Sequence, residues 1–128
     1  MTDRAGKAII LAVDDTPENL DVVKGALGDE YVIKAAINGM IALKIAEKAP
    51  PDLILLDIRM PGMDGFEVIE RLKANVKTRA IPVIFLTGES DCDTEHRAME
   101  LGAKGFVIKP IDVDTLIDAV NRTLSYSG

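Results

Sequence analysis

Ala8-Ile9-Ile10-Leu11-Ala12-Val13 is the stretch of sequence that decides the fold. Every residue in it is apolar, so it lacks the alternation of apolar and polar residues that is typical of a strand with one face in water. A run of this kind predicts a β-strand that is buried on both faces, as in a parallel sheet covered by helices. The acidic pair Asp14-Asp15 follows directly.

The segment after this strand predicts a helix. Thr16-Pro17-Glu18 combines a capping hydroxyl, a proline suited to the first helical position and an acid in the first turn. Apolar residues then recur at helical spacing, at Leu20, Val23 and Leu27. Gly28 is a natural stop.

The same alternation of strand and helix recurs along the rest of the chain. Further strands are predicted at residues 31–36, 53–56, 82–86 and 105–108. After the second strand, Asn38 is expected to cap a helix that buries Ile41, Ala42, Ile45 and Ala46. The helix at about 92–101 is mostly polar, which predicts light packing and mobility. Asp112 is expected to cap the last helix.

Five βα units with right-handed crossovers predict an α/β fold in which a doubly wound, five-stranded parallel sheet has helices on both faces. The expected strand order is the flavodoxin-like 2-1-3-4-5. We expect one domain over residues 1–128, with its core at about 8–124, because 48% of the residues are hydrophobic and no linker interrupts them.

Charge and composition exclude several classes of protein. The net charge of −6 opposes direct contact with nucleic acid or an anionic membrane surface. No apolar run approaches the roughly 20 residues of a membrane-spanning helix. Cys92 is the only cysteine, and residues 1–7 are polar, so an intrachain disulfide is excluded and a cytoplasmic location is expected.

Acidic residues follow two strands that the expected order makes neighbours. Asp14-Asp15 ends the first strand and Asp57 ends the third, so three carboxylates meet at the carboxyl edge of the sheet. Their repulsion favours a divalent cation, with Mg²⁺ predicted and Mn²⁺ as a substitute. Asp14-Asp15 alone is about as well explained as a helix cap, and Asp57 favours the metal site.

Two more polar residues end neighbouring strands at the same edge. Thr87 follows the fourth strand, and Lys109-Pro110 follows the fifth. Alone, they would be an ordinary strand-end hydroxyl and a solvated lysine. Together with Asp57 they provide a carboxylate nucleophile, a hydroxyl donor and a cation, which are the functional groups needed to transfer a phosphoryl group.

These residues, with Met60-Pro61-Gly62-Met63-Asp64-Gly65 between them, resemble in order and spacing the receiver domain of two-component response regulators. The resemblance covers about residues 8–124, and the chain is similar to the single-domain chemotaxis receiver. It implies that Asp57 accepts a phosphoryl group from a sensor histidine kinase, a histidine phosphotransfer protein or a small donor such as acetyl phosphate. The chain would then be a signalling switch that catalyses only its own phosphorylation and dephosphorylation.

The resemblance also implies a set of metal ligands. Asp15 and Asp57 would bind Mg²⁺ directly, and Asp14 would bind it through water. The backbone carbonyl of Arg59 would complete the ligands from the protein. A salt bridge from Arg59 to Glu89 across the site mouth is a further hypothesis, which predicts slow autodephosphorylation.

The remaining implied roles concern switching. Lys109, after a cis Lys109-Pro110 bond, and Thr87 would each contact a phosphoryl oxygen. Phe106 would turn inward as Thr87 moves, although an ordinary core phenylalanine explains it nearly as well. The switched surface would comprise the fourth helix, the fifth strand and the fifth helix, and would control a downstream effector protein or a C-terminal effector domain.

Other interpretations remain open to different degrees. A flavodoxin-like FMN binder shares the expected fold but needs a glycine- or hydroxyl-rich phosphate loop where Asp14-Asp15 stands. Phosphatases of the haloacid dehalogenase type also use an aspartate nucleophile, in a D-x-D motif that follows a strand. Here Arg59 stands in place of the second acid of that motif. A module of the same fold that acts without phosphorylation is also possible. Residues 16–21 and 81–87 are similar to receivers that precede cyclic-dinucleotide cyclase or phosphodiesterase domains, and whether the chain is complete stays open.

Overall fold

The computed structural model describes residues 7–88 and 92–127, and within them five strands alternate with five helices. The strands are β1 (Ile9–Val13), β2 (Val32–Ala36), β3 (Leu53–Asp57), β4 (Val83–Thr87) and β5 (Gly105–Ile108). The helices are α1 (Pro17–Leu27), α2 (Gly39–Lys48), α3 (Gly65–Ala74), α4 (Cys92–Glu100) and α5 (Val113–Ser127). Each predicted strand differs from the observed one by at most one residue at either end.

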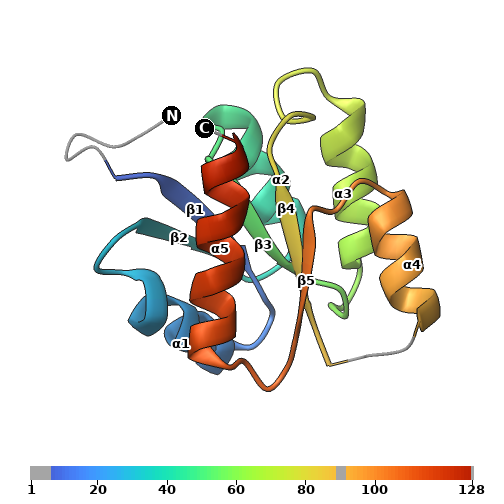
Figure 1. Cartoon of the computed structure of the whole chain (residues 1–128). Coiled ribbons are helices and arrows are strands. Elements are labelled where there is room, and N and C mark those ends of the chain that lie inside the picture. The colour runs from blue at the N-terminus through green and yellow to red at the C-terminus, as the bar shows by residue number, and fades with distance from the viewer. Residues whose placement is uncertain (1–6, 89–91, 128) are drawn as a thin grey trace.

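All five strands are parallel and form one sheet in the order β2-β1-β3-β4-β5. The predicted α/β class and the flavodoxin-like order are therefore confirmed. Helices cover both faces of the sheet, with α1 and α5 on the near face in Figure 1 and α2 and α3 behind it. The order makes β1, β3 and β4 the interior strands, with β2 and β5 at the edges.

The interior strands are buried on both faces. Alternate side chains of β3 point to opposite faces, so Ile54 and Leu56 pack with α2, α3 and α4, whereas Leu53 and Leu55 pack with α1 and α5. Strands β1 and β4 divide their residues between the same two clusters. The all-apolar runs of the sequence thus have a common cause, which is that neither face of these strands meets water.

Helix α4 is held by few contacts, as its polar sequence predicts. Among its described side chains only Ala98 is buried. Arg97 adds a cation–π contact to α3, because its guanidinium carbon lies 4.3 Å from the centre of the Phe66 ring. Whether α4 is mobile stays a prediction. Over residues 7–88 and 92–127, no helix is long and apolar enough to cross a membrane.

Two predictions about helix faces and caps were wrong. Asn38 caps α2 as expected, with its side-chain oxygen accepting a hydrogen bond from the backbone N–H of Ile41 at 2.9 Å. The side chain of Ile41, however, is 38% exposed and lies outside the buried stripe. Thr16 occupies the cap position of α1, but its hydroxyl makes no capping hydrogen bond. Asp14 accepts a hydrogen bond from the backbone N–H of Thr16 instead, at 2.9 Å.

These caps predict unequal effects of two similar substitutions. Asn38→Ala should lower the free energy of unfolding by about 1 kcal/mol, because the hydrogen bond to the Ile41 N–H is lost. Thr16→Ala should change it by less than about 0.5 kcal/mol, because no capping bond is removed. Urea unfolding followed by circular dichroism measures both, and equal losses for the two variants would contradict the assignment of the caps.

Candidate functional site

Three carboxylates lie together at the carboxyl edge of the sheet. Val13 pairs with Leu56 across β1 and β3, so the next residues along these strands, Asp14 and Asp57, are level with each other. Together with Asp15 they offer carboxylate oxygens that all lie within 4.8 Å of one another. Asp14 and Asp57 are only 1% and 4% exposed, whereas Asp15 faces solvent. The predicted meeting of these three residues is confirmed.

One ammonium group lies between the two buried carboxylates. The Nζ atom of Lys109 is 2.8 Å from Oδ2 of Asp14 and 3.2 Å from Oδ1 of Asp57. The backbone N–H of Lys109 donates to the carbonyl oxygen of Thr87 at 2.7 Å, which attaches the segment after β5 to the end of β4. The Lys109-Pro110 bond is cis, as the resemblance implied.

The electrostatic balance at this edge is negative. Burial, and after it the neighbouring charge of Asp14, raise the pKa of Asp57 to about 6 against the opposing effect of Lys109. Burial lowers the pKa of Lys109, but its hydrogen bond to Asp14 and the charge of Asp57 outweigh burial, and the net shift is upward. Three carboxylates therefore face one ammonium, and their oxygens suit a hard divalent cation.

Thr87 and Phe106 occupy different levels of the sheet. Thr87 is fully buried at the last position of β4, one residue beyond the Leu86 that pairs with Asp57. Phe106 lies further from the edge, opposite Phe85, and packs partly buried against the cluster beneath α2, α3 and α4. Thr87 is thus at the rim with the carboxylates, and Phe106 is not. Their roles in switching stay predictions.

The loop that carries Arg59 depends on a glycine whose role the sequence did not reveal. The backbone N–H of Gly65 donates to the carbonyl of Ile58 at 2.8 Å. A Cβ atom at Gly65 would lie 2.4 Å from the carbonyl oxygen of Asp57, closer than any side chain tolerates. The start of α3 therefore packs directly on the backbone of Asp57 and Ile58. The pair Asp64-Gly65 was the available signal, since an N-cap next to glycine indicates a tight helix entry.

Arg59 lies in the loop that follows β3. Its side chain is exposed, and the direction of its backbone carbonyl toward a metal stays a prediction. Glu89, its suggested partner, lies outside the described residues. Within the described ranges, the only acidic, cysteine or histidine group arranged to hold a metal ion is that of Asp14, Asp15 and Asp57.

Comparisons with known proteins find similar sequences and structures. The sequence model of a family described as the response regulator receiver domain matches residues 10–121. A probable cyclic di-GMP phosphodiesterase of Vibrio cholerae is 47% identical over 115 residues, which are 90% of this chain and 26% of that protein. This chain thus spans about a quarter of that relative's length.

Two further relatives are short enough for this chain to cover nearly all of them. Sporulation initiation phosphotransferase F of Bacillus subtilis is 40% identical over 116 residues, which are 90% of this chain and 92% of that protein. The crystallised chemotaxis protein CheY4 of Vibrio cholerae superimposes with a TM-score of 0.86 at 32% identity, covering 91% of this chain and 98% of that one.

The raised pKa predicts that Asp57 destabilises the metal-free protein. In a chelator at pH 7, Asp57→Asn should raise the free energy of unfolding by on the order of 2 kcal/mol, because the folded state disfavours a charge on a group whose pKa is about 6 instead of 3.8. A pKa raised by folding gives stability at low pH that is lost as the pH rises. The advantage of Asn should therefore be small near pH 4 and grow up to about pH 6.

The control for this measurement is Asp21→Asn, which changes an exposed carboxyl on α1 and should alter the unfolding free energy by less than about 0.5 kcal/mol at any pH. Unfolding by urea at several pH values measures both variants. If Asp57→Asn were no more stable than the wild type at pH 7, the electrostatic description of the site would be wrong.

The close packing of Gly65 gives a second prediction. Gly65→Ala should lower the free energy of unfolding by about 1–3 kcal/mol, because the new Cβ must displace the backbone at Asp57 and Ile58. Gly25→Ala is the matched control. An added Cβ meets nothing within 4 Å at that exposed position of α1, so alanine should stabilise by about 0.5–1 kcal/mol. Thermal unfolding distinguishes the two, and a stable Gly65→Ala would refute the packing argument.

Proposed function

The chain belongs to the response regulator receiver domain family, and we propose that it is a switch controlled by phosphorylation of Asp57. The observation that carries the proposal is the nearly buried Asp57 carboxylate, with Asp14 beside it and the ammonium of Lys109 within 3.2 Å. A carboxylate in this setting is held in place, directed at the edge of the sheet and next to a cation. These are the requirements for attack on a phosphoryl group.

The metal site follows from the same residues. Asp15 and Asp57 would hold Mg²⁺ directly and Asp14 through water, with the carbonyl of Arg59 as a further ligand. The donor set fits, because the three carboxylates present oxygens within 4.8 Å of one another and leave room for water and phosphoryl oxygens. When bound, Mg²⁺ neutralises the oxygens of the group that is transferred.

In the transfer step a carboxylate oxygen of Asp57 forms a bond to phosphorus as the bond from phosphorus to the donor's nitrogen or oxygen breaks. The product is an acyl phosphate on Asp57 and a donor that keeps the electron pair. Lys109 already lies at 3.2 Å from Asp57 and would pair with a phosphoryl oxygen of the product. The Thr87 hydroxyl would hydrogen-bond another oxygen.

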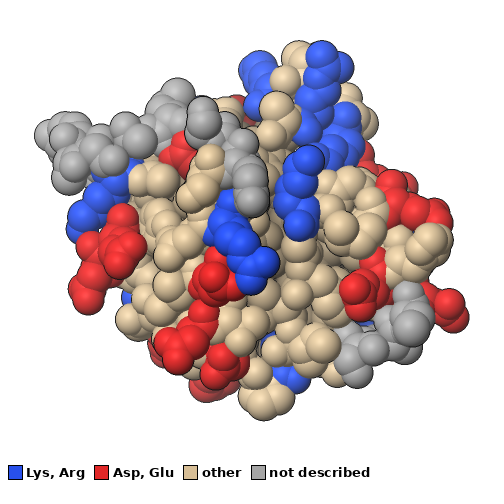
Figure 2. Space-filling view, viewed as in Figure 1, with Lys and Arg blue, Asp and Glu red and all other residues tan. Residues whose placement is uncertain are grey.

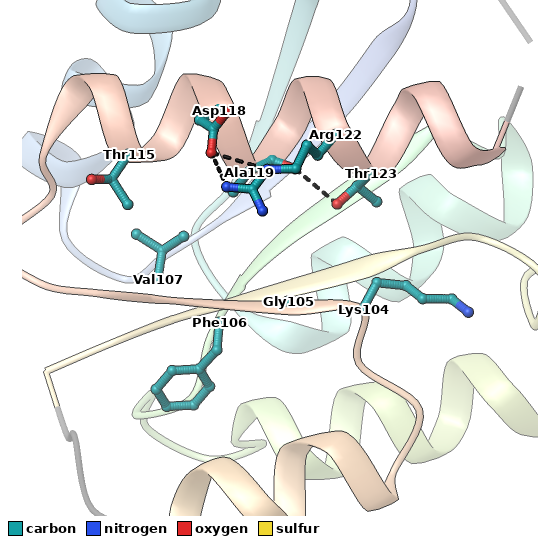
Figure 3. Close-up of a pocket in the computed structure, with 9 residues that line it drawn as sticks. All are labelled: Lys104, Gly105, Phe106, Val107, Thr115, Asp118, Ala119, Arg122 and Thr123. Carbon is teal, nitrogen blue, oxygen red and sulfur yellow. Dashed lines mark hydrogen bonds and ion pairs between the residues drawn. The ribbon is translucent and has the colours of Figure 1, made fainter.

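Switching would spread from Thr87 to the neighbouring edge of the molecule. Thr87 pairs with Ile108 on β5, two residues from Phe106. Figure 3 shows Phe106 pointing away from α5, while Val107 points toward it. Between β5 and α5 lies a groove of about 500 Å³, whose lining includes Gly105, Ala119 and Arg122. We propose that the partner binds the surface formed by α4, β5 and α5, which includes this groove.

The partners that the proposal names are a sensor histidine kinase or histidine phosphotransfer protein as donor and an effector protein or attached effector domain as output. The relative named as a phosphodiesterase favours an attached output, and the one named as a phosphotransferase favours a relay. In either case the chain acts on its own Asp57 and turns over no external substrate. The single cysteine suits a reducing compartment, so the proposal places the chain in the cytoplasm.

Incubation with acetyl phosphate tests the proposal. Intact-mass measurement should show one phosphoryl adduct on the wild type with Mg²⁺, and none in a chelator or on Asp57→Asn, because attack needs both the carboxylate and the metal. Lys109→Gln should slow the reaction by roughly 10²-fold, as when one preorganised stabilising group is removed. A folded wild type that binds Mg²⁺ but takes no phosphoryl group would favour the alternative, a module of this fold that works without phosphorylation.

A further inference from the structure

Basic residues gather at the end of the sheet opposite the phosphorylation site. Residues 71–82 contain four Lys or Arg and no Asp or Glu, in a chain whose net charge is −6. Figure 2 shows Lys and Arg together at the top of the molecule, where Figure 1 places the segment between α3 and β4. Lys104, just before β5, is at the same end of the sheet. We call Lys73, Lys77, Arg79 and Lys104 the basic pole.

Lys73 lies near other members of the basic pole, and the described residues provide no acidic partner for any of the four. Nζ of Lys73 donates to the carbonyl oxygen of Arg79 at 3.1 Å. Burial lowers the pKa of Lys73, and the nearby charge of Lys104 lowers it further. In the part of the chain that the structure describes, no carboxylate forms an ion pair with any of the four. An anion brought to this surface would relieve their mutual repulsion.

The loop that carries this charge is held in one conformation. The Thr78 hydroxyl is buried and donates to the carbonyl of Leu72 at 2.7 Å. Asn75 accepts backbone hydrogen bonds from three residues of the loop. Its side-chain oxygen accepts from the N–H of Lys77 at 2.9 Å, and its carbonyl oxygen accepts from the N–H groups of Thr78 and Arg79 at 3.1 and 2.8 Å. A loop ordered before binding loses little conformational entropy when a partner arrives.

An apolar contact point adjoins the charge. Val76 is 73% exposed, the highest value among the large hydrophobic side chains described. It lines a hollow of about 460 Å³ between α2 and α3, whose wall includes Leu43, Leu72 and Ala74. Arg71 and Glu47 also line the hollow. An exposed apolar side chain beside a hollow with mixed apolar and polar walls and a charged rim is the arrangement of a binding surface.

We propose that the basic pole, together with Val76 and the adjoining hollow, binds an acidic protein segment that inserts an apolar side chain. The four cations supply the charge complementarity, and the hollow has the size for one or two apolar side chains. Nucleic acid and lipid surfaces fit less well, because they extend well beyond a patch of this size and meet the repulsion of the net charge of −6.

This surface is independent of the phosphorylation site. The residues of the basic pole lie before β4 and β5, at the amino ends of the parallel strands. Asp57, Thr87 and Lys109 lie at the carboxyl ends. Binding is therefore expected in a chelator, without phosphorylation, and with Asp57→Asn as well as with the wild type. A failure of the phosphorylation experiment leaves this inference standing, and the reverse also holds.

The test is a titration of the ¹⁵N-labelled chain with a synthetic peptide of glutamates and leucines, followed by amide chemical shifts in a chelator. Shifts should gather at residues 73–79 and near Lys104. Lys77→Gln combined with Lys104→Gln should weaken binding about three- to tenfold through the loss of two exposed charge contacts. Lys24→Gln combined with Lys34→Gln makes the same charge change on α1 and β2, at the far edge of the sheet, and should have less than a twofold effect.

Substitution of Val76 by Ser separates the apolar contact from the charge. It should weaken binding of the leucine-containing peptide and leave a peptide with serine in place of leucine unaffected. The inference is overturned if the acidic peptide does not bind, if its shifts map to another surface, or if both double variants weaken binding equally. It is also overturned if a single-stranded oligonucleotide or anionic vesicles bind the same residues more tightly than the peptide does.

Discussion

Burial of β1, β3 and β4 on both faces is the constraint on which the rest of the structure depends. Their apolar side chains are shared between two helical layers, so the strands cannot slide or turn without exposing one layer to water. In these three strands, polar side chains therefore occur only at the strand ends. Asp14, Asp57 and Thr87 stand at such ends, and their positions are set by packing that takes place elsewhere in the domain.

Placing these carboxylates close together at the edge of the sheet is electrostatically unfavourable. Two nearly buried carboxylates share one ammonium, and the third carboxylate adjoins them in solvent. Added positive charge would therefore make the site more favourable, and this would couple the binding of a cation to the proposed phosphorylation of Asp57. Gly65 contributes by bringing the start of α3 onto the backbone of Asp57, so the proposed nucleophile is held in place by a packed helix.

The sequence allowed the fold and most of the site to be predicted, for an identifiable reason. Doubly buried strands are apolar throughout, and the residues that follow them stand out by contrast. Details of individual side chains were harder to predict, because more than one hydrogen bond or packing arrangement fits the same sequence. Thr16 stands at the cap position of α1, but its hydroxyl caps no N–H of the helix, and its own N–H donates to Asp14. Ile41 matched the helical spacing but falls at the margin of the buried stripe, and the close approach at Gly65 arises between segments that sequence patterns do not bring together.

The length of the strands has a consequence of its own. β4 has five residues, so it is about 16 Å long at the usual rise of a strand. Charges in water at physiological ionic strength are screened over about 8 Å, half that distance. Adding a doubly charged group at one end is thus almost unfelt through solvent at the other. The length of the strands, together with salt in the solvent, thus separates the two ends electrostatically, so selection can alter the charge of one end with little effect on the chemistry of the other.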